Sequence, residues 1–109
     1  MKNLLIILFI LSCAASTASD TMAIKTPTIQ CSMCKQTIES NLSSLNGVKS
    51  ATVDLINYQT VIQYNPNRLN LTDLETAISQ IGYQANGVKA DSIAYEKLHL
   101  CCRLPKDRK

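Results

Sequence analysis

The alternation of strand-like and helix-like segments between residues 22 and 88 constrains the fold of this chain more than any other feature. Apolar residues recur at helical spacing over 34–45 and again over 72–81, and a glycine lies just beyond each stretch. The segments with extended or alternating character are 23–29, 48–57, 59–64 and 83–88. The predicted order is therefore strand, helix, strand, strand, helix, strand.

This order predicts an α+β fold of the ferredoxin-like type. Two helices, each with one apolar face, would cover one side of a four-stranded antiparallel sheet, and the other side would meet solvent. Thr72 and Glu75 form a capping-box pattern at the start of the second helix. A short C-terminal helix with Asp91 as its N-cap follows and leads to a cysteine pair. The predicted domain spans residues 20–89, and the tail spans residues 90–109.

Residues 1–19 have the layout of a secretory signal peptide. A basic start at Lys2 precedes an apolar run that ends in small residues, and the run is far shorter than the ~20 apolar residues of a membrane span. Ile10-Leu11-Ser12-Cys13 resembles a bacterial lipobox, and in that alternative Cys13 would carry a lipid anchor as the expected membrane contact. Either cleavage predicts an exported protein of the periplasm or cell envelope.

Charge is weakly positive, with a formal net value of +3. Several of the basic residues lie in the segment 103–109, which we expect to be a frayed, solvated end. The rest of the predicted domain shows no basic stripe and few aromatic residues for base stacking. Nucleic acid is therefore not an expected partner.

The chain has five cysteines, of which Cys13 belongs to the leader. The other four form two close pairs, Cys31 with Cys34 and Cys101 with Cys102. A disulfide within either pair would close a very short loop and remove little unfolded-state entropy. Cross-pairing between the two pairs would close a long loop and is an open alternative in an oxidising compartment.

The CxxC pair formed by Cys31 and Cys34 lies where the first helix is predicted to begin. Soft d10 ions favour thiolate ligands, and two thiolates at this spacing can converge on one ion. Cys34 falls in the first helical turn, where the helix dipole favours the thiolate, and Lys35 is expected to act in the same direction. Two thiolates on an exposed loop suit metal transfer, because an incoming thiol can attack the open side of the ion.

Four short motifs mark the boundaries of the predicted elements: Cys31-Ser32-Met33-Cys34, Leu45-Asn46-Gly47-Val48, Asn65-Pro66 and Ile81-Gly82-Tyr83. Together with the element order, they resemble the heavy-metal-associated (HMA) domain family over residues 22–88. This family includes copper chaperones, metal-binding repeats of P-type ATPases and periplasmic mercury-binding proteins. The resemblance implies a cargo of Cu(I), Hg(II) or Zn(II), an envelope metal transporter as partner, and no catalysis.

The tail looks like the ending of small secreted bacterial members that finish in a paired-cysteine segment. If it folds back, Cys101 and Cys102 with His99 could raise the coordination number or relay the metal; the pair could also bridge two chains or hold a separate ion. The family's usual Met two positions before the first cysteine is Ile29 here, and we expect Ile29 to keep the core role. Met33 is expected to pack locally in the loop.

Two other functions use the same residues. A thiol-disulfide oxidoreductase would also place CxxC at a helix N-terminus. Against it stand the absence of Trp and the Ser32-Met33 pair, which lacks proline. An interaction module without metal is the third alternative, because a fold does not fix function. The sequence favours a soft-metal protein, and two sulfurs alone do not discriminate Cu(I) from Hg(II).

Overall fold

The computed structural model describes residues 19–108. All but the last residue of the predicted signal peptide (residues 1–19), including the lipobox cysteine Cys13, lie outside the described residues. No helix within 19–108 has the length and apolar character to cross a membrane. The elements are β1 (Asp20–Lys25), α1 (Ser32–Ser43), β2 (Val48–Asp54), β3 (Gln59–Tyr64), α2 (Leu71–Ile81), α3 (Ser92–Glu96) and the 3-10 turns η2 (Leu100–Cys102) and η3 (Pro105–Asp107).

The three strands form one antiparallel sheet in the order β1-β3-β2. The hairpin between β2 and β3 is confirmed, and its turn is closed by the carboxylate of Asp54. Asp54 Oδ1 accepts hydrogen bonds from the backbone N–H groups of Ile56 (2.9 Å) and Asn57 (3.1 Å). Tyr58 completes the turn with a positive φ of 54°. The central strand β3 therefore receives a partner on each side.

The predicted fourth strand at 83–88 is wrong. The backbone N–H of Ala85 donates to the carbonyl of Val88 (3.0 Å) and the N–H of Val88 donates back to Ala85 (2.8 Å), so this segment closes a tight turn on itself. Asn86, with a positive φ of 51°, is the residue that touches β1: its N–H donates to the Lys25 carbonyl at 2.7 Å. The α+β class is thus confirmed, whereas the four-stranded ferredoxin-like sheet is not.

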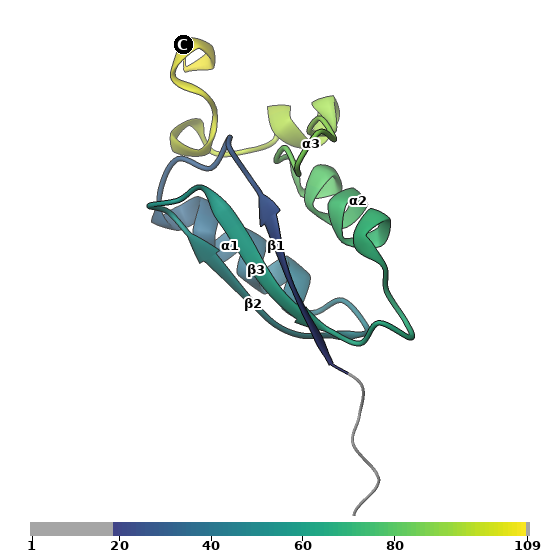
Figure 1. Ribbon diagram of the computed structural model, residues 1–109. Helices are drawn as coiled ribbons and strands as arrows, with labels where there is room; N and C mark the ends of the chain where they lie inside the picture. Colours follow the sequence, from purple (N-terminus) through teal and green to yellow (C-terminus); the bar gives the residue numbers. More distant parts are fainter. Residues whose placement is uncertain (1–18, 109) are drawn as a thin grey trace, which may run out of the picture.

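Helix α1 carries the predicted apolar stripe. Ile38 and Leu42 are fully buried, and Cys31 is the N-cap residue. Leu45, the third predicted member of the stripe, lies beyond the end of the helix. This helix packs against both α2 and β2. Figure 1 shows α1 behind the sheet.

Helix α2 is capped differently from the prediction. A capping box is present, but it joins Asn70 to Asp73, two residues before the predicted Thr72–Glu75 pair. The Glu75 carboxylate is used elsewhere, since it accepts a hydrogen bond from the side-chain amide of Asn86 at 2.9 Å. The predicted stop at Gly82 is confirmed: this residue is in the left-handed conformation with φ 111°.

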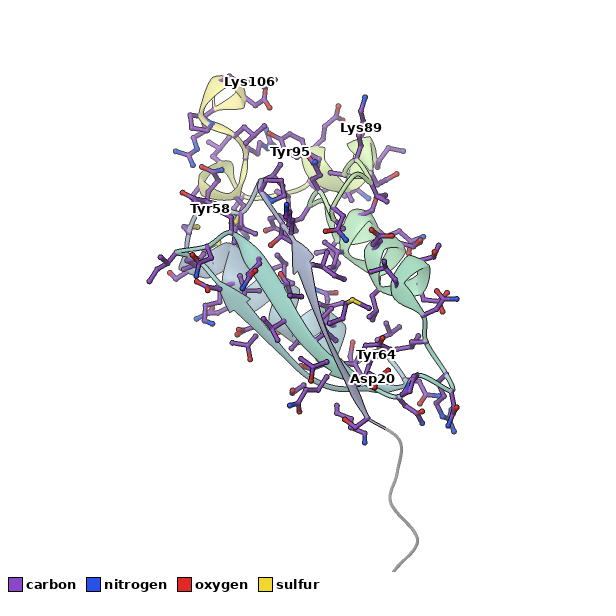
Figure 2. All side chains as sticks on the ribbon, in the orientation of Figure 1. Asp20, Tyr58, Tyr64, Lys89, Tyr95 and Lys106 are labelled. Atoms are coloured by element: carbon purple, nitrogen blue, oxygen red, sulfur yellow. The ribbon has the colours of Figure 1, made fainter. Side chains whose placement is uncertain are left out.

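One apolar core joins the sheet to the helices, and the tail lies over one end of it. In Figure 1 the tail sits above the end of the sheet where β1 finishes and α1 begins. Figure 2 shows Tyr58 at this end, with Asp20 and Tyr64 at the opposite end. The core residues that are fully buried are Ile24, Ile29, Cys34, Ile38, Leu42, Ile62, Leu74, Ile78, Tyr83 and Ala85.

Candidate metal centre

The CxxC motif straddles the start of α1. Cys31 is extended (φ −154°, ψ 176°) and is the last residue before the helix. Cys34 is the third helical residue, which confirms its predicted place in the first turn. The two sulfur atoms are 3.7 Å apart. The backbone N–H of Gln30 donates to Cys34 Sγ at 3.4 Å and helps to fix the position of this sulfur.

The sequence predicts an exposed loop for the two thiols, but the structure shows both of them at least partly buried. Cys34 is fully buried, and Cys31 is partly buried. Ile29, on the strand side of the loop, is also fully buried, which confirms its expected core role. The core therefore fixes the loop through these buried side chains. The accessible part of the site is the neighbourhood of Cys31.

Lys35 does not serve the thiols in the way that its position had suggested. Its Nζ lies 2.7 Å from Glu39 Oε2 and donates to the Val53 carbonyl at 2.9 Å. Glu39 also accepts a hydrogen bond from the Val53 N–H at 2.8 Å. Partial burial opposes ionisation of Glu39, but the Lys35 and Val53 hydrogen bonds outweigh it and lower the pKa of its carboxyl. This pair joins α1 to the edge strand β2.

The cysteine thiols differ in acidity. Burial opposes the thiolate of Cys31, but hydrogen bonds from the backbone of Cys34, the thiol of Cys101 and the backbone of Met33 outweigh it and lower its pKa to about 7. The pKa of Cys101 is raised, chiefly by the neighbouring Cys31. Burial and then Cys34 raise the pKa of Cys102. Cys31 is thus the thiol of this trio that is most readily ionised near neutral pH.

The tail brings the second cysteine pair to the CxxC motif. Cys101 Sγ lies 3.5 Å from Cys31 Sγ and 4.0 Å from Cys102 Sγ. The thiols of Cys31, Cys101 and Cys102 all lie within 4.8 Å of one another. The predicted third helix is real but ends at Glu96, so the cysteines lie in the separate turn η2. Cys102 is buried (2% exposed) and Cys101 is exposed.

Arginine side chains hold η2 in place, so the expected frayed end is not what the structure shows. Arg108 Nη2 donates to the Cys101 carbonyl at 3.0 Å, and Arg108 Nε donates to the Leu100 carbonyl at 3.1 Å. Arg103 Nε donates to the Leu98 carbonyl at 3.2 Å. The two guanidinium groups thus donate to backbone carbonyls within η2 and just before it.

Tyr95 ties α3 to the end of the tail. Its hydroxyl donates to Asp107 Oδ2 at 2.5 Å and accepts from the Leu104 N–H at 2.8 Å. Figure 2 shows Tyr95 near the junction of α3 with the rest of the tail, and Lys106 at the far end of the tail. These hydrogen bonds link the part of the tail before η2 to the part after it.

His99 and Met33 are the two remaining side chains considered for the site, and the structure places them differently from one another. His99 is exposed and lies outside the thiol group, and its carbonyl accepts from the Cys102 N–H at 2.8 Å. Its role as a ligand stays a prediction. Met33, expected only to pack in the loop, has its Sδ 3.8 Å from Cys101 Sγ. The sequence signal that Met33 lies at the site is its position between the two cysteines of the motif.

Tyr83 is a second residue whose place at the site the sequence did not reveal. It follows Gly82, and the left-handed turn there directs the chain back into the core. Its buried hydroxyl has no hydrogen-bond partner among the described residues. Burial, followed by the neighbouring thiols of Cys102 and Cys34, raises the pKa of Tyr83. The hydroxyl therefore stays protonated in the core beside these thiols.

The donor set consists of sulfur. All four cysteines of the described residues are free, and the two pairs approach each other at Cys31 and Cys101, one of the cross-pairings left open above. Thiolates suit Cu(I), Hg(II), Zn(II) and similar soft ions, whereas Mg²⁺ and Ca²⁺ prefer oxygen. The fold and the donors together define a small α+β domain of the thiolate metal-binding class.

Comparison with known families identifies this class more closely. The family model described as "Heavy-metal-associated domain" matches residues 23–84, more than half of the chain. The protein belongs to this family. The matched region contains Cys31 and Cys34 and ends before Cys101 and Cys102.

Two curated relatives show where the likeness lies. The chain is 40% identical over 55 residues to the copper chaperone CopZ of Staphylococcus haemolyticus, covering 50% of this chain and 81% of the relative. It is 38% identical over 56 residues to a copper-exporting P-type ATPase of Staphylococcus aureus, covering 51% of this chain and 7% of the ATPase. The second match is therefore to a small part of a much longer protein.

Solved structures give the same fold. A CopZ metallochaperone has a TM-score of 0.58 at 30% identity, covering 61% of this chain and 98% of its own. Oxidised MerP from Ralstonia metallidurans has a TM-score of 0.60 at 25% identity, covering 63% of this chain and 96% of its own. Both likenesses leave more than a third of this chain uncovered.

Proposed function

We propose that this protein binds a soft d10 metal ion, with Cu(I) and Hg(II) as the leading candidates, through Cys31 and Cys34, and transfers or sequesters it in the cell envelope. The observation that carries the proposal is the pair of free sulfurs 3.7 Å apart at the start of α1, inside the region that matches the HMA family. Zn(II) belongs to the same chemical class and is a further candidate.

The local structure suits capture of an ion by ligand exchange. Cys34 is held by the first turn of α1 and by the Gln30 N–H, while the Cys31 thiol is hydrogen-bonded to the first-turn backbone of Met33 and Cys34 and lies at the more accessible side of the pair. Both sulfurs are therefore held close together before an ion binds. Binding and release require no chemical step beyond exchange of sulfur ligands and protons.

Partner and location are part of the same proposal. The likeness to domains of copper-exporting ATPases favours a metal transporter, or another metal-binding domain, as the exchange partner. The signal-peptide pattern favours export to the periplasm or envelope, with a lipid anchor at Cys13 as the alternative form.

Titration of the purified, reduced protein with Cu(I), Hg(II) and Zn(II) tests the proposal. We expect tight binding that the double variant Cys31→Ser/Cys34→Ser loses, and Ser32→Ala, which alters the same loop without removing a sulfur, should bind like the wild type. Unchanged binding in the double variant would overturn the proposal. Turnover of a dithiol substrate by Cys31 and Cys34 would instead support the oxidoreductase alternative.

A further inference from the structure

We propose that the tail (residues 90–108) is a lid that supplies Cys101 and Cys102 as further ligands, so that the ion is held by three or four sulfurs and not by two. This inference rests on the proposed function, because it concerns the same ion. The tail lies beyond the region that the family model matches, which ends at residue 84. What it adds to the site is therefore a feature of this chain.

The sulfur spacing is the first argument. Two sulfurs bound at about 2.3 Å to one ion lie about 3.8 Å apart when four ligands surround the ion, and about 4.6 Å apart when they face each other across it. The successive separations here are 3.7 Å from Cys34 to Cys31, 3.5 Å from Cys31 to Cys101 and 4.0 Å from Cys101 to Cys102. The sulfurs of Cys31, Cys101 and Cys102 all lie within 4.8 Å of one another, which matches a compact thiolate site, and the successive separations are too short for a linear two-sulfur site.

The way in which η2 is held is the second argument. Adjacent cysteine side chains diverge on an extended backbone, but the 3-10 turn brings Cys101 and Cys102 to one side. Cys102 is buried beside Cys34 and Tyr83, and the turn is fixed from outside by Arg108. The tail therefore places the Cys102 thiol in the core and the Cys101 thiol at the exposed side of the site.

Additional ligands change what the site does with an ion. A two-thiolate ion is open to attack, whereas a closed thiolate site retains its metal. In the lidded form, release begins when an acceptor thiol loses its proton and bonds to the ion, while the bond from the ion to Cys101 breaks and Cys101 takes up a proton. The lid therefore favours retention, and ions that accept three or four thiolates, such as Cd(II), Zn(II) and Hg(II), gain most from it.

The test counts sulfur ligands and measures release. X-ray absorption of the Cd(II)-loaded protein reports the number of sulfur ligands, and transfer of Cu(I) to a chromogenic chelator reports the exchange rate. Cys101→Ser is the main variant because Cys101 is exposed and its loss should leave the fold intact. Lys97→Ala, an exposed residue on the same tail that is not a candidate ligand, is the matched control. The double variant Cys101→Ser/Cys102→Ser extends the series.

We expect three or four sulfurs in the wild type and in Lys97→Ala, one fewer in Cys101→Ser and two in the double variant. We also expect Cu(I) transfer from Cys101→Ser to be roughly tenfold faster or more, because a closing ligand is lost. Two sulfurs in the wild type, with equal transfer rates for wild type and Cys101→Ser, would overturn the lid while leaving binding at Cys31 and Cys34 intact. Failure of the wild type to bind any of these ions would overturn the proposed function itself.

Discussion

The domain body (residues 20–88) and the tail are stabilised by different interactions. The body has a core of fully buried aliphatic side chains, whereas α3 has no buried residue and the tail is held by side-chain hydrogen bonds to carbonyl groups and by Cys102. Apolar burial contributes about 25 cal/mol per Å², while a surface hydrogen bond contributes only about 1 kcal/mol. The difference indicates that the tail can open locally while the body stays folded.

Truncating one leucine in each region gives the largest expected contrast. Leu42→Ala removes a fully buried side chain of the body and should lower the free energy of unfolding by about 2–5 kcal/mol. Leu100→Ala changes a side chain that is 52% exposed on the tail and should shift it by less than about 0.5 kcal/mol. Chemical denaturation of the reduced protein measures both. Equal losses would show that tail and body unfold as one unit.

Gly82 lies at the junction of the two regions, and its substitution should give the next largest effect. A Cβ at this position would meet the backbone of Ala94 at 3.1 Å, and the positive φ disfavours any side chain. We expect Gly82→Ala to cost about 1–2 kcal/mol from the left-handed conformation alone. It should also raise hydrogen exchange in α3, since Ala94 must move. Gly87→Ala is the matched control, because a Cβ there has no neighbour within 4 Å; exchange in α3 that does not change would contradict the close contact.

Glu39 tests the attachment of α1 to the sheet, on the body side. Glu39→Gln should reduce stability at neutral pH by about 1 kcal/mol, because an ionised acceptor for Lys35 and Val53 is lost. The folded-state pKa of Glu39 lies below the ordinary glutamate value of 4.5, so its contribution is present above that pH and fades as pH falls through the folded pKa. Denaturation curves of variant and wild type should therefore converge in acid. A gap that stays constant with pH would show that the charge is not involved.

Arg108 gives the smallest expected change in global stability and the most local one. Arg108→Ala removes the donors to the carbonyls of Leu100 and Cys101, and should leave the free energy of unfolding within about 0.5 kcal/mol. Alkylation of the buried Cys102 in the metal-free protein should become a few-fold faster as η2 opens more often. Lys106→Ala, on the same part of the tail, is the control. Equal alkylation rates in the wild type and both variants would show that Arg108 does not hold η2 in place.

The parts of the fold that follow local rules could be read from the sequence. The stripe of Ile38 and Leu42, the stop at Gly82 and the position of Cys34 in the first helical turn depend on neighbours a few residues away. The strand predicted at 83–88 failed because Asn86-Gly87 supports a turn whose own carbonyls satisfy the backbone donors. A period-2 pattern does not reveal that competition.

The site could be predicted only in part, for the same reason. The CxxC pair was evident from spacing, but the approach of Cys101 to Cys31 joins residues 70 positions apart. The side chains that create it, Arg108 among them, suggest a solvated end when seen in sequence alone. Tyr83 was recognised as part of a motif and not as a neighbour of the thiols. Contacts of this kind depend on how the tail packs, which no local pattern records.

The short connection from the body to η2 has a consequence for any exchange partner. The segment between Val88 and Leu100 is short, so a tail thiol that leaves the site stays close to it. A group tethered in this way acts at an effective concentration in the millimolar range. A freely diffusing thiol at micromolar concentration would lose that competition. Productive exchange would therefore require a partner that first docks on the protein and presents its own thiols at comparable local density.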